Sequence, residues 1–305
     1  MNNYKKTGLF FFLLQISFGF SQSKFDSFFK PTDTLNTQRR NKVVISEVVI
    51  SATALIGLNQ LWYADYPKSS FHTINDNDEW LQMDKAGHVF SSYHLGCFGA
   101  NALKWSGASK KEQLIYGATF GFVFLSSVEV LDGYSSQWGF SIGDIAANAS
   151  GTLLFVSQEL IWNEQRIVPK FSFHTTSYAA IRPEVLGSNF SEQLLKDYNG
   201  QTYWLSGNLH SFFKQSKIPK WLNIAVGYGA DAMLSANNQV NNAFSIKNQD
   251  RIRQFYLSFD ADLTRIKTKS HFLKTLFVLF NTIKIPAPSF EISSSQGIKF
   301  HYFHF

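Results

Sequence analysis

Four long apolar segments in the first half of the chain restrict its fold more than any other feature. Each is rich in Ala, Gly, Leu, Val and Phe, and helix-breaking residues such as Pro67, Ser106-Gly107 and Asp132-Gly133 follow the first three. The spacing therefore predicts four helices, each long enough for a compact bundle or for a bilayer. They cover Val43 to Tyr63, Ala86 to Trp105, Gln113 to Leu131, and Ile145 to Trp162.

Polar residues interrupt all four segments. They are Glu47, Asn59, His88, His94, Asn101, Glu129, Asn148 and Glu159. A polar group that faces lipid costs several kcal/mol, so we expect these side chains to turn toward one another inside the bundle. Small residues such as Gly96, Gly117 and Gly151 would let the helices approach closely. Soluble helical cores use the same residues, so the composition leaves a membrane-embedded and a soluble bundle both open.

Three pairs of polar residues lie at helix ends: Asp84 with His88, Glu129 with Asp132, and Asp144 with Asn148. Each pair is three or four residues apart and so shares one helix face. In an antiparallel bundle, the start of the second helix, the end of the third and the start of the fourth lie at one pole. We therefore expect one polar cluster, made of Asp84, Lys85, His88, Glu129, Asp132, Asp144 and Asn148.

The cluster has two interpretations. As a metal or acid–base site it would use His and carboxylates, which suit Zn, Mn or Fe. The metal-ligand candidates are Asp84, His88, Glu129, Asp132 and Asp144, and the catalytic candidates are the same residues without Asp132. As a structural contact, His88 would lie between Asp84 and a second carboxylate, Lys85 would pair with Glu129 or Asp132, and Asn148 would cap a carbonyl.

We favour the structural interpretation, because hydrogen-bond satisfaction explains polar groups at helix ends. The sequence contains no His-Glu-x-x-His motif, so no cofactor is predicted, and a divalent metal stays as the alternative. His94 and Cys97 lie three residues apart, but two residues without close Cys or His partners are expected to be core or surface residues.

The cluster motifs resemble a known family. Asp84-Lys85-x-x-His88, Glu129-x-x-Asp132-Gly133 and Ser141-x-Gly-Asp144-x-x-x-Asn148 look like the uncharacterised YfiM-like family of predicted periplasmic lipoproteins. Two of these motifs are also similar to the VanZ-like membrane family. The likeness covers about residues 40 to 165 and implies an envelope protein without an assigned activity. It does not carry lipidation over, because the chain's single Cys is Cys97 in mid-helix.

The N-terminus predicts export. Residues 1–22 carry Lys5 and Lys6, then an apolar run from Leu9 to Phe20, and read as a signal peptide, with a retained short anchor as the alternative. We expect the periplasm or the outer membrane of a Gram-negative-type envelope. Residues 23–41 follow as a predicted mobile lead-in. The net charge is +6, and removal of Lys5 and Lys6 with the signal peptide leaves 6 − 2 = +4, which is too small to favour nucleic acid as a partner.

After Pro169 the hydrophobic period changes from helical to alternating, which predicts strands. Transmembrane barrels need at least eight strands, so the six candidates favour a sheet packed on the helices. Ser270 to Ile283 predicts one amphipathic helix, either on a membrane surface or packed on the sheet. The strand candidates are Phe171 to Arg182, Tyr203 to Leu209, Trp221 to Met233, Gln254 to Thr264, Ser289 to Ser293 and Ile298 to Phe305.

The sequence thus predicts an α+β chain with a helical domain over residues 42–168 and a β-rich domain over residues 169–305. The favoured function is a membrane-associated envelope protein with a structural or accessory role, in contact with membrane lipid and with an envelope protein partner. One alternative is an envelope enzyme, metal- or acid/base-dependent, that acts on a lipid or cell-wall precursor. The other is a scaffold subunit of an outer-membrane complex, whose unpaired strands complete a partner's sheet.

Overall fold

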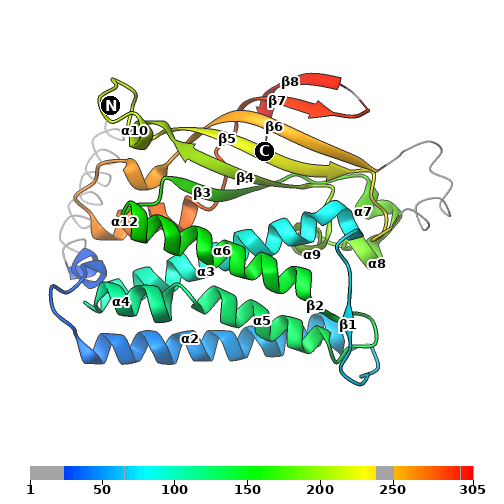
Figure 1. The fold of residues 1–305 in the computed structure, drawn as a ribbon, viewed down its shortest axis with the longest axis horizontal. Coiled ribbons are helices and arrows are strands. Elements are labelled where there is room, and N and C mark those ends of the chain that lie inside the picture. The colour runs from blue at the N-terminus through cyan, green and yellow to red at the C-terminus, as the bar shows by residue number, and fades with distance from the viewer. Residues whose placement is uncertain (1–23, 65, 238–250, 296, 305) are drawn as a thin grey trace, which may run out of the picture.

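A computed structural model describes residues 24–64, 66–237, 251–295 and 297–304. The predicted signal peptide lies outside these residues. The first half of the chain forms a layer of helices, and the second half forms an antiparallel sheet above them (Figure 1). The mixed class and the C-terminal antiparallel sheet are therefore confirmed.

The four predicted helices are present. Helix α3 packs against α5 and α6, while α2 buries only Val43 among its residues. Because α3 also contacts the sheet, a separate four-helix bundle is not confirmed. The helices are α2 (Thr37–Leu58), continued by a π-helical segment (Asn59–Tyr63), α3 (Met83–Trp105), α4 (Lys110–Glu112), a second π-helical segment (Gln113–Gly117), α5 (Phe120–Asp132) and α6 (Ile142–Ile161). Short strands β1 (Thr73–Ile74) and β2 (Phe140–Ser141) pair in parallel before α3 and α6.

Glycines set the distance between the helices. A methyl group added at Gly121 of α5 would overlap the backbone carbonyl of Ser92 on α3. Gly151 of α6 meets the carbonyl of Val89 on α3 in the same way. These contacts leave no room for a side chain, so both neighbours of α3 depend on glycine at the point of contact.

We expect Gly121→Ala to lower the free energy of unfolding by about 1–3 kcal/mol, the usual cost of overpacking. Gly57→Ala on α2 is the matched control, because nothing lies within 4 Å of the added methyl group. The control should gain about 0.5–1 kcal/mol from helix propensity. Thermal unfolding of the purified variants, followed by circular dichroism, measures both changes. Equal stability of the two variants would contradict the close contact.

The sheet has six strands whose order follows the chain: β3 (Ile167–Phe173), β4 (Gln201–Asn208), β5 (Leu222–Asp231), β6 (Ile252–Ala261), β7 (Ala287–Ser293) and β8 (Gly297–His304). All six strand candidates overlap its strands. The first overlaps β3 only at residues 171–173, because β3 begins at Ile167 and the rest of the candidate leads into the short helix α7 (Tyr178–Ile181), which α8 (Pro183–Leu186) follows. The remaining helices are α9 (Phe190–Lys196), α10 (Leu209–Phe212) and α12 (His271–Phe280), the last within the predicted amphipathic segment.

The two faces of the sheet have opposite polarity. One face is polar and buried, and includes Ser206, Asn208, Asn223, Ser258, Asp260, Ser289 and Glu291. The other face is apolar and exposed over most of its area. We call its exposed part the sheet surface, made of Leu205, Ile224, Val226, Phe255, Leu257, Phe259, Phe290, Ile292 and Phe300. A sheet in water normally buries its apolar side, so the polarity here is inverted.

An ion pair lies on the buried face. The Nζ atom of Lys170 is 2.8 Å from Oδ2 of Asp260, and both side chains are fully buried. The hydroxyl of Ser206 donates to Asp260 at 2.6 Å, and the backbone N–H of Ile285 donates to its other oxygen at 3.0 Å. Lys170 also donates to the carbonyl of Ala261. Each charge is thus compensated by hydrogen bonds as well as by its partner.

Helix α3 contacts the sheet through His94. Its Nε2–H donates to the carbonyl of Pro169 on β3 at 2.7 Å, and its ring packs against Phe90. The thiol of Cys97 accepts from Asn101 of the same helix. His94 is therefore a core residue bonded to the sheet, as expected.

Burial lowers the pKa of His94 to about 4. Its unfolded value is about 6.5, so between pH 6.5 and 4 the unfolded chain binds more protons than the folded protein. Stability should therefore fall as the pH falls through this window, by about 3 kcal/mol in total for this residue. His94→Gln keeps a donor near the carbonyl without a titrating group and should flatten the curve. Unfolding free energies at pH 7, 6, 5 and 4 for both proteins test this, and equal slopes would contradict it.

Candidate functional site

A strained turn places the start of α3. In the 3-10 turn Glu79–Gln82, Trp80, Leu81 and Gln82 have φ angles of 46°, 51° and 64°. Left-handed backbone costs about 1–2 kcal/mol per non-glycine residue, so the surroundings must hold it. The carbonyl of Leu81 accepts a hydrogen bond from Arg253 at 3.0 Å and another from Tyr228, and these residues lie on β6 and β5. The sheet thereby fixes the first turn of α3.

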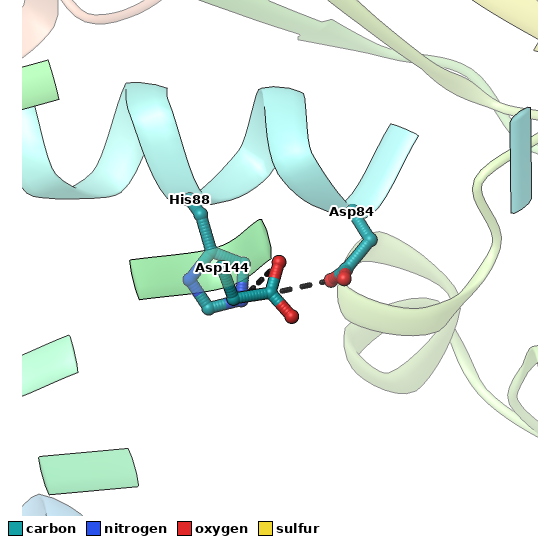
Figure 2. Close-up of side chains that lie close together, drawn as sticks. All are labelled: Asp84, His88 and Asp144. Atoms are coloured by element: carbon teal, nitrogen blue, oxygen red, sulfur yellow. Dashed lines mark ion pairs between the residues drawn. The ribbon is translucent and has the colours of Figure 1, made fainter. Parts of the chain in front are cut away.

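His88 lies at the centre of the predicted cluster. Its Nε2 atom is 3.7 Å from Asp84, 3.6 Å from Glu129 and 3.8 Å from Asp144. Its Nδ1 atom is 2.9 Å from the amide oxygen of Asn148. Figure 2 shows Asp84 and Asp144 converging on the imidazole. Side chains from α3, α5 and α6 thus meet at one pole.

Lys85 does not pair as predicted. Its Nζ lies 2.6 Å from Asp76, 2.8 Å from Asp144 and 3.2 Å from Asp84. The prediction of Glu129 or Asp132 was wrong, because the loop before α3 and the start of α6 lie on the Lys85 side of the helix. Nor does the Asn148 side chain cap a carbonyl, since its buried amide nitrogen has no hydrogen-bond partner among the described residues, while its oxygen faces His88.

Asp132 is the cluster candidate that the structure places apart. It accepts a hydrogen bond of 2.6 Å from the hydroxyl of Tyr63, next to the end of α2. It has no direct contact with His88 or Lys85 among the described residues. The end of α5 therefore contributes Glu129 to the centre and Asp132 to a neighbouring contact.

Sequence reasoning missed Asp76 and Tyr198. Asp76 lies in the loop before α3, where the run Asn75-Asp76-Asn77-Asp78 was the available signal. The hydroxyl of Tyr198, from the loop between α9 and β4, donates to Asp84 at 3.1 Å. No local pattern points to this contact, because 114 residues separate its partners.

Ser141 joins these groups at the start of α6. It caps the helix, and its hydroxyl accepts from the backbone N–H of Asp144 at 3.1 Å. The same hydroxyl donates to Asp76 at 2.6 Å. Its backbone N–H donates to Glu129 at 3.3 Å. One residue thus donates to two carboxylates and caps the helix at a third acidic residue.

The cluster contains more carboxylates than cations. In the described part of the chain, the cationic partners of Asp76, Asp84, Glu129 and Asp144 are Lys85 and His88. Burial, and then the charge of Asp84, raises the pKa of Asp144 to about 7. Burial disfavours a charged imidazole, but the neighbouring carboxylates outweigh it and raise the pKa of His88 above its ordinary value. The arrangement therefore attracts a further positive charge, either a proton or a metal ion.

Asp84, His88 and Asp144 could hold a metal ion. In the described part of the chain, one ligand atom from each lies within 4.8 Å of the others. Ligand atoms bonded to a transition metal at about 2.0–2.2 Å lie roughly 3–3.5 Å apart, so the 3.7 and 3.8 Å spacings from His88 would have to contract. The two carboxylates would have to approach each other from within 4.8 Å. Asn148 would fix the imidazole from its other nitrogen, as outer partners of metal-bound His do.

Residues 74–157 match a family described as predicted periplasmic lipoprotein (DUF2279). The matched range includes the cluster from Asp76 to Asn148 and leaves out Tyr198. It supports an exported, periplasmic protein of an uncharacterised envelope family, while the YfiM-like and VanZ-like details stay predictions. No curated protein and no solved structure matches the chain.

Proposed function

We propose that the chain is a membrane-associated envelope protein with an accessory, structural role, in which Asp84, His88 and Asp144 bind one divalent cation. The observation that carries the proposal is the environment of Nε2 of His88. Three carboxylate oxygens surround this atom at 3.6–3.8 Å. Each lies beyond hydrogen-bond distance, so none of them satisfies it.

The other ring nitrogen sets the tautomer. Nδ1 of His88 faces the amide oxygen of Asn148 at 2.9 Å, so Nδ1 carries a proton. In the neutral imidazole, Nε2 then presents its lone pair to three carboxylates, which is unfavourable. A cation between Nε2, Asp84 and Asp144 would reverse this repulsion. His with carboxylates suits Zn²⁺, Mn²⁺ or Fe²⁺.

The role follows from the elements that the ligands connect. Asp84 and His88 lie on α3, and Asp144 begins α6. A bound cation would tie the two helices together at one pole and offset the surplus of carboxylates. Glu129 of α5, 3.6 Å from His88, would add a third helix to the contact.

Calorimetric titration of chelator-treated protein with Zn²⁺ and with Mn²⁺ tests the proposal. We expect one ion per chain and a higher melting temperature, with about 2.7 kcal/mol of added stability at a free concentration of one hundred times the Kd. If folded protein binds neither ion, the proposal is wrong. The ion pairs of Lys85 with its three carboxylate partners would then stabilise the cluster without a bound cation.

A second candidate is an envelope enzyme that acts on a lipid or cell-wall precursor. Two observations favour it. The side chain of Asp84 is 27% exposed, so solvent reaches the cluster, and the pKa of Asp144 near 7 suits proton transfer at neutral pH. Incubating the cation-loaded protein with phospholipid and with cell-wall precursor lipid, followed by product analysis, separates the two roles. Turnover that disappears in Asp144→Asn would favour the enzyme.

A further inference from the structure

We propose that two exposed apolar surfaces of the protein lie in the acyl-chain region of a lipid bilayer. One is the sheet surface defined above. The other is the outward side of α2, which we call the α2 surface and which includes Val44, Ile45, Val48, Val49 and Ile56. This inference rests on the membrane association in the proposed function and names the parts of the chain that make the contact.

The sheet surface is continuous across five strands. Leu205, Val226, Leu257, Phe290 and Phe300 lie directly opposite one another from β4 to β8. Their exposed fractions range from 45% to 58%. A second row runs parallel to them through Phe255 and Ile292. Such an area is far larger than the scattered apolar residues of an ordinary surface.

The sheet cannot bury this surface by exchanging its buried face and its exposed face. Its opposite face carries the Lys170–Asp260 ion pair, and these charges need the hydrogen bonds that surround them. Apolar residues outward and polar residues inward is the arrangement that the strands of transmembrane barrels adopt, where lipid covers the outer face. The inverted polarity therefore matches a lipid environment.

Helix α2 has the same property. It is long and apolar enough to cross a membrane, and 6% of its most apolar window is buried. The exposed fraction of Val48 is 63% and that of Ile50 is 64%. The segment Lys110–Asp132 passes the same test of length and composition, with 22% of its window buried. Burial in the protein thus does not explain the apolar character of α2.

The positions of the two surfaces favour lipid over a protein partner. Helix α2 lies on the other side of α3 from the sheet (Figure 1), and α3 covers the apolar face of the sheet where Phe90 contacts Phe171 and Tyr203. A second copy or another protein docked on one surface would leave the other surface exposed to water. A bilayer contacts both surfaces at once.

Basic residues at one end of the molecule agree with this occupant. Arg39 near the start of α2 packs 4.4 Å above the ring of Trp105, at the end of α3. Lys110 and Lys111 of α4 follow a few residues later in the chain. Basic and aromatic side chains at the end of an apolar helix suit the anionic headgroup layer of a membrane.

Spin-label accessibility in vesicles tests the inference. In full-length Cys97→Ala protein, single cysteines replace Leu257 on the sheet surface, Val48 on the α2 surface and, as a control, the exposed Glu184 of α8. The labelled proteins are reconstituted in phosphatidylethanolamine and phosphatidylglycerol vesicles. At Leu257 and Val48 we expect more collisions with oxygen, which partitions into lipid, than with a water-soluble nickel chelate. The order should reverse at Glu184.

Two results would overturn the inference while membrane association stands. In both, the protein floats with the vesicles. In the first, the label at Leu257 or at Val48 is reached mainly by the nickel chelate. In the second, the label at Leu257 is shielded from both reagents and shows dipolar broadening, which identifies a second copy of the chain as the occupant. Protein that does not float with the vesicles would reject the membrane association itself, and cation titration tests the cluster separately.

Discussion

Lys170→Met is expected to lower the free energy of unfolding by about 3–5 kcal/mol, because it leaves Asp260 as an unpaired buried charge. Both side chains are fully buried, and their charged atoms are 2.8 Å apart. The hydrogen bonds from Ser206 and Ile285 remain in the variant, but they do not neutralise the carboxylate. Thermal or denaturant unfolding in a fixed detergent measures the loss.

Two further variants separate the buried charge from a general effect of substitution. The double variant Lys170→Met, Asp260→Leu removes both charges and should be more stable than the single variant. Lys214→Met removes a lysine that is 66% exposed and 3.6 Å from Glu164, so it should change stability by less than about 1 kcal/mol. If Lys170→Met is as stable as Lys214→Met, the ion pair does not hold the polar face inward.

His88→Ala is expected to weaken cation binding by more than 100-fold, since it removes the ligand around which the carboxylates converge. Asn148→Ala, which removes the partner of Nδ1, should weaken binding by about 10–100-fold. Titration calorimetry measures both affinities. Circular dichroism spectra that match the unsubstituted protein show that the fold is retained.

Asp132→Asn is the matched control for these two variants. Asp132 is a carboxylate of the same helix as Glu129, but its hydrogen bond goes to Tyr63 rather than to His88. We expect it to keep most of the affinity. Equal losses in Asp132→Asn and His88→Ala would mean that the ion responds to the overall negative charge of this pole and is not bound at the proposed ligands.

Much of the cluster could be predicted, because helix alternation is a strong geometric constraint. Helices that reverse direction bring the start of the second, the end of the third and the start of the fourth to one pole, so Asp84, Glu129 and Asp144 meet at His88. Asp76 and Tyr198 were not predicted as members of the cluster, because both lie in loops, where no periodicity relates a residue to its neighbours in space. The shortest ion pair of Lys85 was missed for this reason, because its partner is Asp76.

The sheet illustrates a different limit. Alternation located five of the six strands closely and β3 only at its end, and it correctly separated Leu222, Ile224 and Val226 from Asn223 and Ala225. It could not tell which of the two faces is buried, because a period of two residues is the same in either orientation. The buried face is settled by distant partners such as Lys170 and Asp260, which come from β3 and β6.

Because of the left-handed turn before α3, the helical half of the chain depends on the sheet for the position of its polar cluster. Arg253 and Tyr228 donate hydrogen bonds to the carbonyl of Leu81, which lies three residues before Asp84. A chain truncated after residue 168 would lose these two hydrogen bonds and Tyr198. The turn would then relax to ordinary right-handed backbone. The carboxylate of Asp84 would then move away from the other groups of the cluster. The cluster therefore requires both halves of the chain, and the helices alone would not form it.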